Sequence, residues 1–259
     1  MTLFQSILIA LVEGLTEFLP ISSTGHMILA STAMGIHEDE FVKTFEVFIQ
    51  LGAILAIALM YIKRFFQSLT IYYKLITAFL PTALVGLLAY DYIKAYLFNP
   101  VVVSVSLILG GVILILIDKK VLKQETTVVE VEDLSYKNAF FIGLCQCLSM
   151  VPGTSRAAAT IIGGVFNGLD RKQATEFSFL LAVPTMLAAG GYDLLKSDLA
   201  FSSEQLILLG VGFVVAFAAA WGAVKLFLSY VSTHGFTAFG WYRIALGILF
   251  LVFMWGADL

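Results

Sequence analysis

The chain has 259 residues, of which 60% are hydrophobic and 13% are charged, and its formal net charge is −3. About a quarter of the residues of an ordinary soluble domain are charged, so this composition excludes one and indicates an integral membrane protein. The charged residues lie mainly in short connecting segments and form no single basic patch, so we expect no nucleic acid partner.

The first predicted element is a broken apolar stretch over residues 3–34, which is interrupted at Pro20 and the polar residues that follow it. Its second leg has about 13 residues and would reach only ~20 Å as a helix, which is short of a ~30 Å hydrocarbon core. We therefore predict a re-entrant helical hairpin. A second stretch, residues 136–167, is broken in the same way at Pro152 and predicts a second hairpin. Non-helical backbone at membrane depth must be buried in protein or line a watery cavity, so the two breaks indicate an internal site.

Three apolar segments follow each broken stretch, and all six are long enough to cross the membrane as helices. They are residues 41–62, 71–93, 101–117, 172–195, 205–229 and 238–257. Long segments that are apolar on every face exclude a transmembrane barrel, in which apolar and polar residues alternate. The predicted fold is an all-α polytopic membrane protein with six transmembrane helices and two re-entrant hairpins.

The order of one hairpin and three spans occurs twice, and the two copies align without a gap at an offset of 132 residues. Three identical pairs support this alignment: Pro20 with Pro152, Ser23 with Ser155, and Phe45 with Phe177. Because three crossings are an odd number, the second copy enters the membrane upside down. We predict one membrane domain, residues 1–259, with inverted repeats at about 1–117 and 136–259 and a linker over 118–135.

The distribution of basic residues predicts the orientation. With the N-terminus outside, eleven of the 15 basic residues fall in cytoplasmic segments, Arg243 among them, and only Lys43, Lys94 and Lys196 fall outside. This satisfies the positive-inside rule, so we predict that both termini are outside and that the linker is cytoplasmic.

Glu13 and Glu17 are four residues apart, so on a helix both carboxylates lie on one face close to the first break. A carboxylate within the membrane costs about 2.5–3.5 kcal/mol, and two on one face also repel each other. They therefore need a shared cation or a proton. The alternative is that they lie shallow enough to be hydrated and only cap the hairpin.

Ser22, Ser23, Thr24 and His26 follow the first break. Ser23 and His26 can approach each other across one helical turn, and a hydroxyl beside an imidazole is typical of a nucleophile and its proton-transfer partner. The alternative is that the hydroxyls only cap the second leg and that the histidine is a packed residue.

The second break contributes Thr154, Ser155 and Arg156, which predict a helix N-terminus that presents free amides, two hydroxyls and a guanidinium. Such a group favours a phosphate. The alternative is that Arg156 only neutralises an acidic residue. Thr160, one turn further, extends the polar face or bonds back to its own helix. If the hairpins enter from opposite faces, their tips meet near the middle of the membrane, where a site suits a lipid-borne substrate.

At these residues the chain resembles the bacterial undecaprenyl-diphosphate phosphatase family of the bacitracin-resistance type. Two motifs carry the resemblance: EGLTEFLPISSTGH from Glu13 to His26, and PGTSRAAAT from Pro152 to Thr160. The resemblance implies an enzyme of the bacterial inner membrane that removes the terminal phosphate of undecaprenyl diphosphate, a lipid for which bacitracin competes. The family's second motif usually has serine where this chain has Ala157, so one hydroxyl is missing.

The resemblance also implies roles for individual residues. The acids matching Glu13 and Glu17 are associated with a divalent cation, Mg²⁺ or Ca²⁺. The residues matching Ser23, His26, Ser155 and Arg156 are associated with catalysis and diphosphate binding. Together with the polar residues of the two breaks, this predicts His26, Ser23, Glu17 and Arg156 as catalytic residues and Ser22, Thr24, Thr154, Ser155, Arg156 and Thr160 as substrate-binding residues. A histidine nucleophile, a serine nucleophile with histidine as base, and direct attack by water all fit the spacing. The competing hypothesis is a secondary transporter or flippase for a phosphate-bearing anion or lipid, because inverted repeats with broken helices are also typical of carriers.

Overall fold

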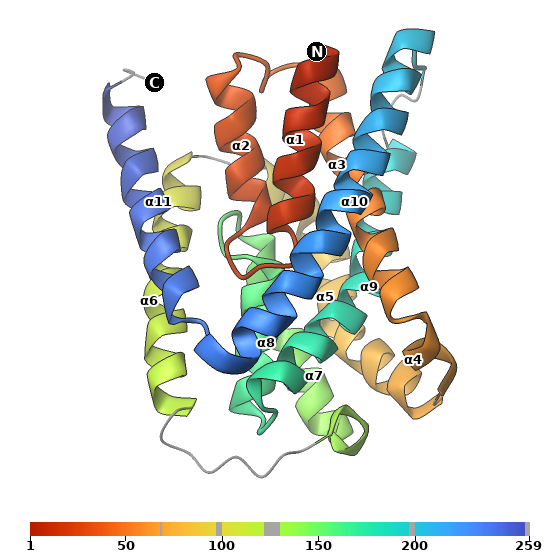
Figure 1. Cartoon of the computed structure of the whole chain (residues 1–259), viewed down its shortest axis with the longest axis vertical. Helices are drawn as coiled ribbons and strands as arrows, with labels where there is room; N and C mark the ends of the chain where they lie inside the picture. Colours follow the sequence, from red (N-terminus) through yellow and green to blue (C-terminus); the bar gives the residue numbers. More distant parts are fainter. Residues whose placement is uncertain (68, 97–99, 122–129, 197–199, 257–259) are drawn as a thin grey trace.

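A computed structural model describes residues 1–67, 69–96, 100–121, 130–196 and 200–256 (Figure 1). Within these ranges the regular structure is entirely helical. The elements are α1 (Leu3–Thr16), α2 (Ser23–Ala33), α3 (Glu40–Met60), α4 (Ile62–Gln67), α5 (Leu69–Tyr96), α6 (Pro100–Val121), the 3-10 helix η1 (Val131–Asp133), α7 (Tyr136–Cys147), the 3-10 helix η2 (Leu148–Met150), α8 (Arg156–Phe166), α9 (Arg171–Lys196), α10 (Ser203–His234) and α11 (Thr237–Gly256).

Five of the described helices are long and apolar enough to cross a membrane: α3, α5 over Leu69–Ala89, α6 over Val101–Lys119, α9 and α10. The predicted class, an all-α protein with several membrane spans, is therefore confirmed. The sixth expected segment corresponds to α11. Residue 257, the last of that segment, lies outside the described residues, and the apolar stretch Thr237–Val252 is shorter than a full span. The count of six spans stays a prediction.

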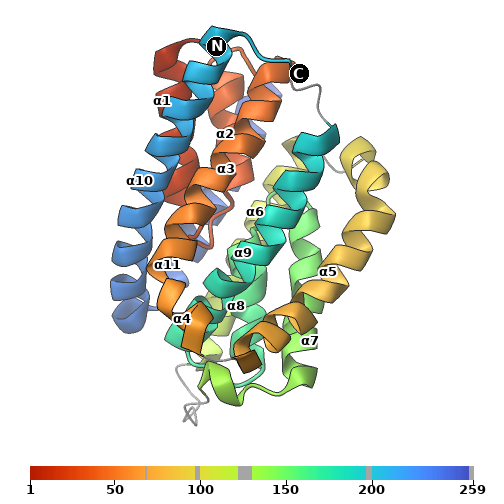
Figure 2. The same ribbon diagram turned by 90° about the vertical axis from the view of Figure 1, so that its right-hand side faces the viewer.

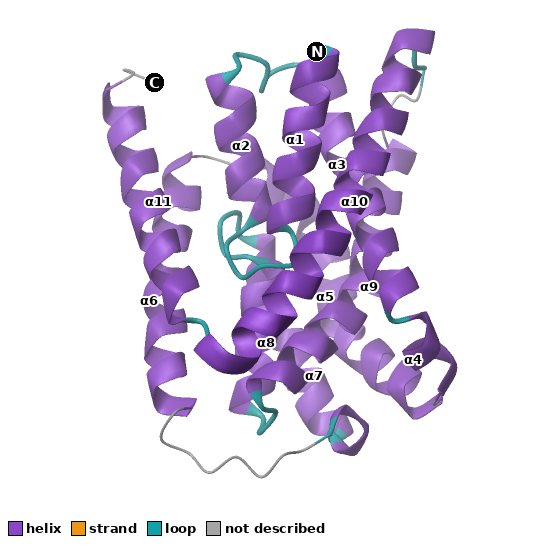
Figure 3. Ribbon diagram, viewed as in Figure 1, coloured by secondary structure: helices purple, strands orange, loops and turns teal. Residues whose placement is uncertain are grey.

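Each broken stretch folds as two short α-helices joined by a turn, α1 with α2 and α7 with α8, and the second connection begins with the 3-10 helix η2. These helices have 14, 11, 12 and 11 residues, so each measures about 16–21 Å. None of the four would reach across a ~30 Å hydrocarbon core. The two turns lie next to each other near the middle of the bundle (Figure 3).

The second leg of each hairpin begins at a serine with an unusual backbone conformation. Ser22 has a φ of 71° and its Oγ accepts from the amide of Gly25, while Ser155 has a φ of 72° and its Oγ accepts from the amide of Ala158. A positive φ is costly for serine, and in the described chain these are the only residues other than glycine that adopt one. The two caps are 133 positions apart, so the ungapped offset of 132 is wrong at the breaks. The turn from Pro152 to its cap is one residue longer than the turn from Pro20.

The first hairpin is held by close helix packing. Helix α10 lies along α1 and α3 (Figure 2), and Gly14 allows the approach, because a Cβ there would stand 2.7 Å from the Cβ of Ala219. Helix α11 packs along α6 (Figure 1). Helix α1 begins and α11 ends at the same end of the bundle, and α6 ends and α7 begins towards the opposite end (Figure 1). Most of the linker, residues 122–129, lies outside the described residues.

One residue of the charge count was placed wrongly. The count places Arg243 on the cytoplasmic side, but its side chain is 0% exposed and lies in the interior of the bundle beside the two breaks. The positive-inside rule counts basic residues by their distance from the ends of apolar segments, so it cannot recognise an arginine that starts at a helix end and points inward.

Candidate active site

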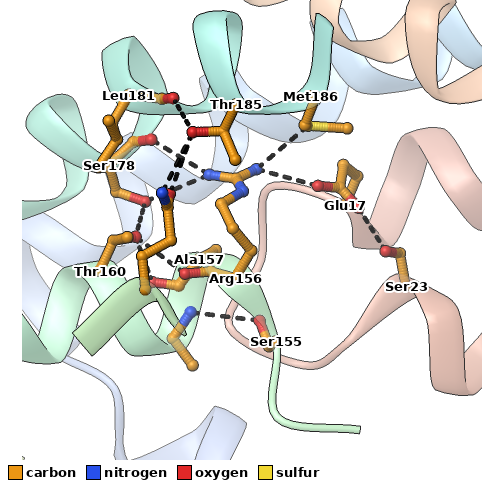
Figure 4. A network of polar contacts seen from close by, with 12 residues as sticks. Glu17, Ser23, Ser155, Arg156, Ala157, Thr160, Ser178, Leu181, Thr185 and Met186 are labelled. Carbon is orange, nitrogen blue, oxygen red and sulfur yellow. Dashed lines mark hydrogen bonds and ion pairs between the residues drawn. The ribbon is translucent and has the colours of Figure 1, made fainter. Parts of the chain in front are cut away.

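Arg156 is the first residue of α8, directly after the cap Ser155, and its side chain is only 10% exposed. Its Nη2 donates to Oε1 of Glu17 at 3.0 Å, and its Nη1 donates to the carbonyl of Ser178 on α9 at 3.1 Å (Figure 4). The guanidinium also lies 5.6 Å from the ring centre of the buried Phe18. These contacts fix the cation at the point where the second break faces the first.

Glu17 ends α1 just before the first break, with 9% of its side chain exposed. Its second oxygen, Oε2, accepts the hydroxyl of Ser23, the first residue of α2. One carboxylate therefore joins a serine of the first break to an arginine of the second (Figure 4). Of the residues that the sequence predicts at the tips of two hairpins, Glu17, Ser23 and Arg156 are therefore in contact.

The network continues into α9 through Thr160. Its hydroxyl lies 2.7 Å from Oγ of Ser178 and 2.9 Å from the carbonyl of Arg156, so this threonine both contacts another helix and bonds back to its own. Sequence reasoning missed Ser178, because a single serine inside an apolar span carries no distinguishing pattern.

His26 has different partners from those expected. Its Nδ1 lies 2.8 Å from the carbonyl of Ser22, and its Nε2 lies 2.7 Å from the hydroxyl of Tyr242 on α11. The rings of His26 and Tyr242 are also nearly parallel. A carbonyl can only accept, so Nδ1 carries the hydrogen, and in the neutral ring the lone pair is on Nε2. The Ser23 hydroxyl thus has Glu17 as its acceptor, and the imidazole of His26 contacts Tyr242. The sequence places Tyr242 in the last predicted span and gives it no role in the site.

Glu13 lies one turn before Glu17 and is 0% exposed, and neither of its carboxylate oxygens has a hydrogen-bond partner. A buried carboxylate without a partner requires a proton or a cation. Carboxylate oxygens are the ligands that divalent hard cations prefer, so Glu13 and Glu17 fit such an ion. Within the described residues, no larger group of His, Cys, Asp or Glu is gathered closely enough to hold a metal.

The other expected binding residues lie in or beside the two turns. Ser22 and Ser155 are the buried caps, so their oxygens accept from helix amides. Thr24 and Thr154 are partly buried beside them.

Arg243 is the main residue that sequence reasoning missed. Its guanidinium donates to five backbone carbonyls at 2.9–3.3 Å: those of Pro20, Ser106, Leu107, Gly153 and Thr154. Three of these carbonyls belong to the two breaks.

The fold and the site define an all-helical polytopic membrane protein with a buried polar site at two helix breaks. Comparison with known proteins gives the particular family. Residues 6–249 match the family model described as bacitracin resistance protein BacA, and the chain belongs to this family.

Its relatives are similar over nearly their whole length. A protein named undecaprenyl-diphosphatase from Wolinella succinogenes is 51% identical over 98% of this chain and 99% of its own. Proteins of the same name from Persephonella marina and Aquifex aeolicus are 49% and 46% identical, over 98% of this chain in both cases and over 100% and 99% of their own.

Proposed function

We propose that this protein is a membrane-embedded phosphatase that hydrolyses undecaprenyl diphosphate to undecaprenyl phosphate and inorganic phosphate. Membership of the bacitracin resistance family and the shared name of its relatives support this activity. The structural observation that carries the proposal is the contact between Arg156 and Glu17, which joins an anion-binding helix start to an acidic group. Recycling of this lipid supports cell-wall synthesis, and bacitracin competes for the same substrate.

The diphosphate is held where α8 begins. Free amides at a helix N-terminus carry partial positive charge, and the forked donors of Arg156 match phosphate oxygens. Ser155 keeps these amides in place as the cap, while Thr154, Thr160, Ser22 and Thr24 complete the polar lining.

The reaction breaks the bond between the distal phosphorus and the bridging oxygen, and that oxygen leaves with undecaprenyl phosphate. Ser23 and His26 are the groups proposed to act at phosphorus. For a serine nucleophile, Glu17 is the acceptor already in place for the hydroxyl proton. For a histidine nucleophile, Nε2 carries the lone pair, and the hydroxyl of Tyr242 must first give way. Activated water is the third alternative. Trapping a phosphorylated enzyme and mapping the modified residue distinguishes the three: phosphoserine, phosphohistidine or no adduct.

Glu13 and Glu17 are the residues proposed to hold a divalent cation, Mg²⁺ or Ca²⁺. Such an ion would neutralise charge on the diphosphate and withdraw electrons from phosphorus. Ala157, which is fully buried, replaces the usual serine of the motif and removes one hydroxyl next to Arg156. A lost neutral hydrogen bond costs about 0.5–1.5 kcal/mol, so we expect slower turnover and not its loss.

The proposed setting is the bacterial inner membrane, with six spans, inverted repeats over about 1–117 and 136–259, and both termini outside. The common end of α1 and α11, opposite the ends that flank the linker, supports this arrangement (Figure 1). The site lies within the membrane and opens to the outer face in this proposal.

A phosphate-release assay separates the phosphatase from the transporter alternative, which the names of the relatives do not favour. Purified protein in detergent has no compartments between which to transport. We expect it to release inorganic phosphate from a polyprenyl diphosphate when a divalent cation is present. Absence of release from well-folded protein would favour a carrier.

A further inference from the structure

Arg243 is the largest of the fully buried side chains in the described chain, and its surroundings are unusual for a cation. No ion pair in that part of the chain includes it. A buried charge without a counter-ion is expensive within a membrane, so its burial requires compensation. The compensation comes from backbone dipoles, because Nε and both nitrogens of the fork donate to five carbonyl oxygens. A guanidinium has five N–H donors, and the five bonds use all of them.

The carbonyls that accept these bonds come from three separate parts of the chain. Nη1 bridges the carbonyls of Pro20 and Thr154, at 3.0 and 2.9 Å, and so links the first break directly to the second. Nη2 adds the carbonyl of Gly153. The remaining two acceptors are carbonyls of α6, which is a regular helix and provides a rigid support.

These bonds flank the reactive groups. Pro20 lies between Glu17 and Ser23, three residues from each, and Thr154 lies two residues before Arg156. A shift of either carbonyl therefore moves one partner of the Glu17–Arg156 pair relative to the other. The hydrogen bonds of Arg243 go to backbone carbonyls of the two turns and of α6.

The neighbouring helix is shaped to receive the guanidinium. A Cβ on Gly110 of α6 would lie 2.8 Å from Cζ of Arg243 and closer still to Nη2, so alanine at this position would displace the fork. Gly153 is likewise pressed against α6, because its Cβ would stand 3.0 Å from the Cβ of Ser106. The space for Arg243 therefore exists only because glycine occupies position 110.

We propose that Arg243 is a positioning residue of the phosphatase: its guanidinium holds the two breaks at a fixed separation and so sets the geometry in which Arg156, Glu17 and Ser23 meet the diphosphate. Lysine keeps the charge, but its three donors cannot serve five carbonyls in a planar fork. The charge alone is therefore insufficient. The inference rests on the proposed function, because its main readout is phosphate release.

The first test compares Arg243→Lys with wild type as full-length protein in detergent. We expect Arg243→Lys to remain folded by size exclusion and thermal unfolding, but with a kcat about 100-fold lower, since misplacing reacting groups by about 1 Å can cost that much. KM should change little, because the backbone carbonyls already use all five donors of Arg243. Gly110→Ala should lower kcat in the same way although Arg243 is retained. Gly222→Ala on α10 is the matched control, because a Cβ there meets nothing within 4 Å.

The second test is chemical rescue of Arg243→Ala. Methylguanidinium should restore part of kcat, whereas methylammonium at equal ionic strength should not, a difference that a purely structural role or a charge effect would not produce. A wild-type kcat in Arg243→Lys, or equal rescue by both cations, would overturn the inference. If Arg243→Ala does not fold, the kcat values of Arg243→Lys and Gly110→Ala test the inference instead. Absence of release from wild type and Gly222→Ala alike would instead count against the phosphatase function.

Discussion

The carboxylate of Glu17 lies 3.0 Å from the guanidinium of Arg156, although the two residues are 139 positions apart in the chain. Both side chains are about nine-tenths buried, so water could not solvate one charge well if the other were removed. Removing one member of such a pair typically costs about 3–5 kcal/mol, because the other charge is left buried and uncompensated. The ion pair therefore links stability to function at the junction of the two hairpins.

A double-mutant cycle separates these two effects. We expect Glu17→Gln to lose stability and to lower phosphate release about 100-fold or more, because Ser23 and Arg156 both lose their anionic acceptor. Glu17→Gln combined with Arg156→Gln should regain part of the stability, since no unpaired charge remains, without regaining activity. Unfolding in detergent and phosphate release measure the two quantities. Additive stability losses in the double variant would contradict a coupled buried pair.

Part of this site could be predicted from the sequence. Pro20 and Pro152 interrupt apolar stretches, so the two breaks could be identified. Glu13, Glu17 and Arg156 are charged residues within apolar segments, which are rare and usually functional, so most side chains of the site could be identified as well. The expectation that the two breaks lie close together comes from the repeated order of one hairpin and three spans, which makes the hairpins enter from opposite faces.

The partners supplied by other helices could not be predicted in this way. Tyr242 and Arg243 lie in the second turn of an apolar helix, where nothing in the sequence indicates that they point inward, and Ser178 is an isolated serine in a span. Their direction depends on how α9 and α11 are rotated against the hairpins. That rotation is set by tertiary packing between residues that are 22 positions apart for Ser178 and Arg156 and 216 positions apart for Tyr242 and His26. The partners of Ser23 and His26 could not be predicted for a related reason. Ser23 donates to Glu17, and the Nε2 of His26 lies beside the hydroxyl of Tyr242 on a distant helix.

The contact between Tyr242 and His26 predicts a spectroscopic change. The chain has three histidines, so ¹⁵N-histidine labelling gives a simple spectrum in which substitution assigns His26. We expect Nδ1 to carry the hydrogen in wild type and in Tyr242→Phe, while the Nε2 resonance moves when the hydroxyl is lost. Phosphate release should fall about 2- to 10-fold, the equivalent of one hydrogen bond.

The matched control for this change is Tyr230→Phe, because Tyr230 stacks on a different histidine, His234, with ring centres 4.7 Å apart. It should leave the His26 resonances and the rate unchanged. Hydrogen found on Nε2 of His26 in the wild-type protein would contradict the bond from Nδ1 to the carbonyl of Ser22.

The buried carboxylate of Glu13 predicts how stability responds to cations. Without added Mg²⁺ or Ca²⁺, Glu13→Gln should be at least as stable as wild type, because the variant removes a buried acid that has no partner. With the cation, the Tm of wild type should rise with concentration as binding stabilises the folded state, and Glu13→Gln should respond much less. Glu204→Gln, on an exposed residue at the start of α10, is the control. Equal increases of Tm in both variants would exclude Glu13 as a ligand.

Asp118 predicts a loss of stability far from the site. This carboxylate at the linker end of α6 is 2% exposed and bonds Arg171 of α9 at 2.7 Å and the hydroxyl and amide of Thr237 at 2.6 and 3.1 Å. It therefore fastens three helices and caps α11. Asp118→Asn leaves Arg171 unpaired and weakens the cap, so we expect a loss of about 2 kcal/mol or more in the free energy of unfolding.

Because the Asp118 contacts are separate from both breaks, Asp118→Asn should keep kcat near the wild-type value at temperatures where it is folded. Glu40→Gln provides the comparison, since its pair with Lys43 is exposed and contributes at most about 1 kcal/mol. Denaturant unfolding and phosphate release should be measured on the same preparations. If folded Asp118→Asn lowered kcat as strongly as Glu17→Gln, the end of the bundle near the linker would be coupled to the reaction. Asp118 would then affect catalysis as well as stability, contrary to this prediction.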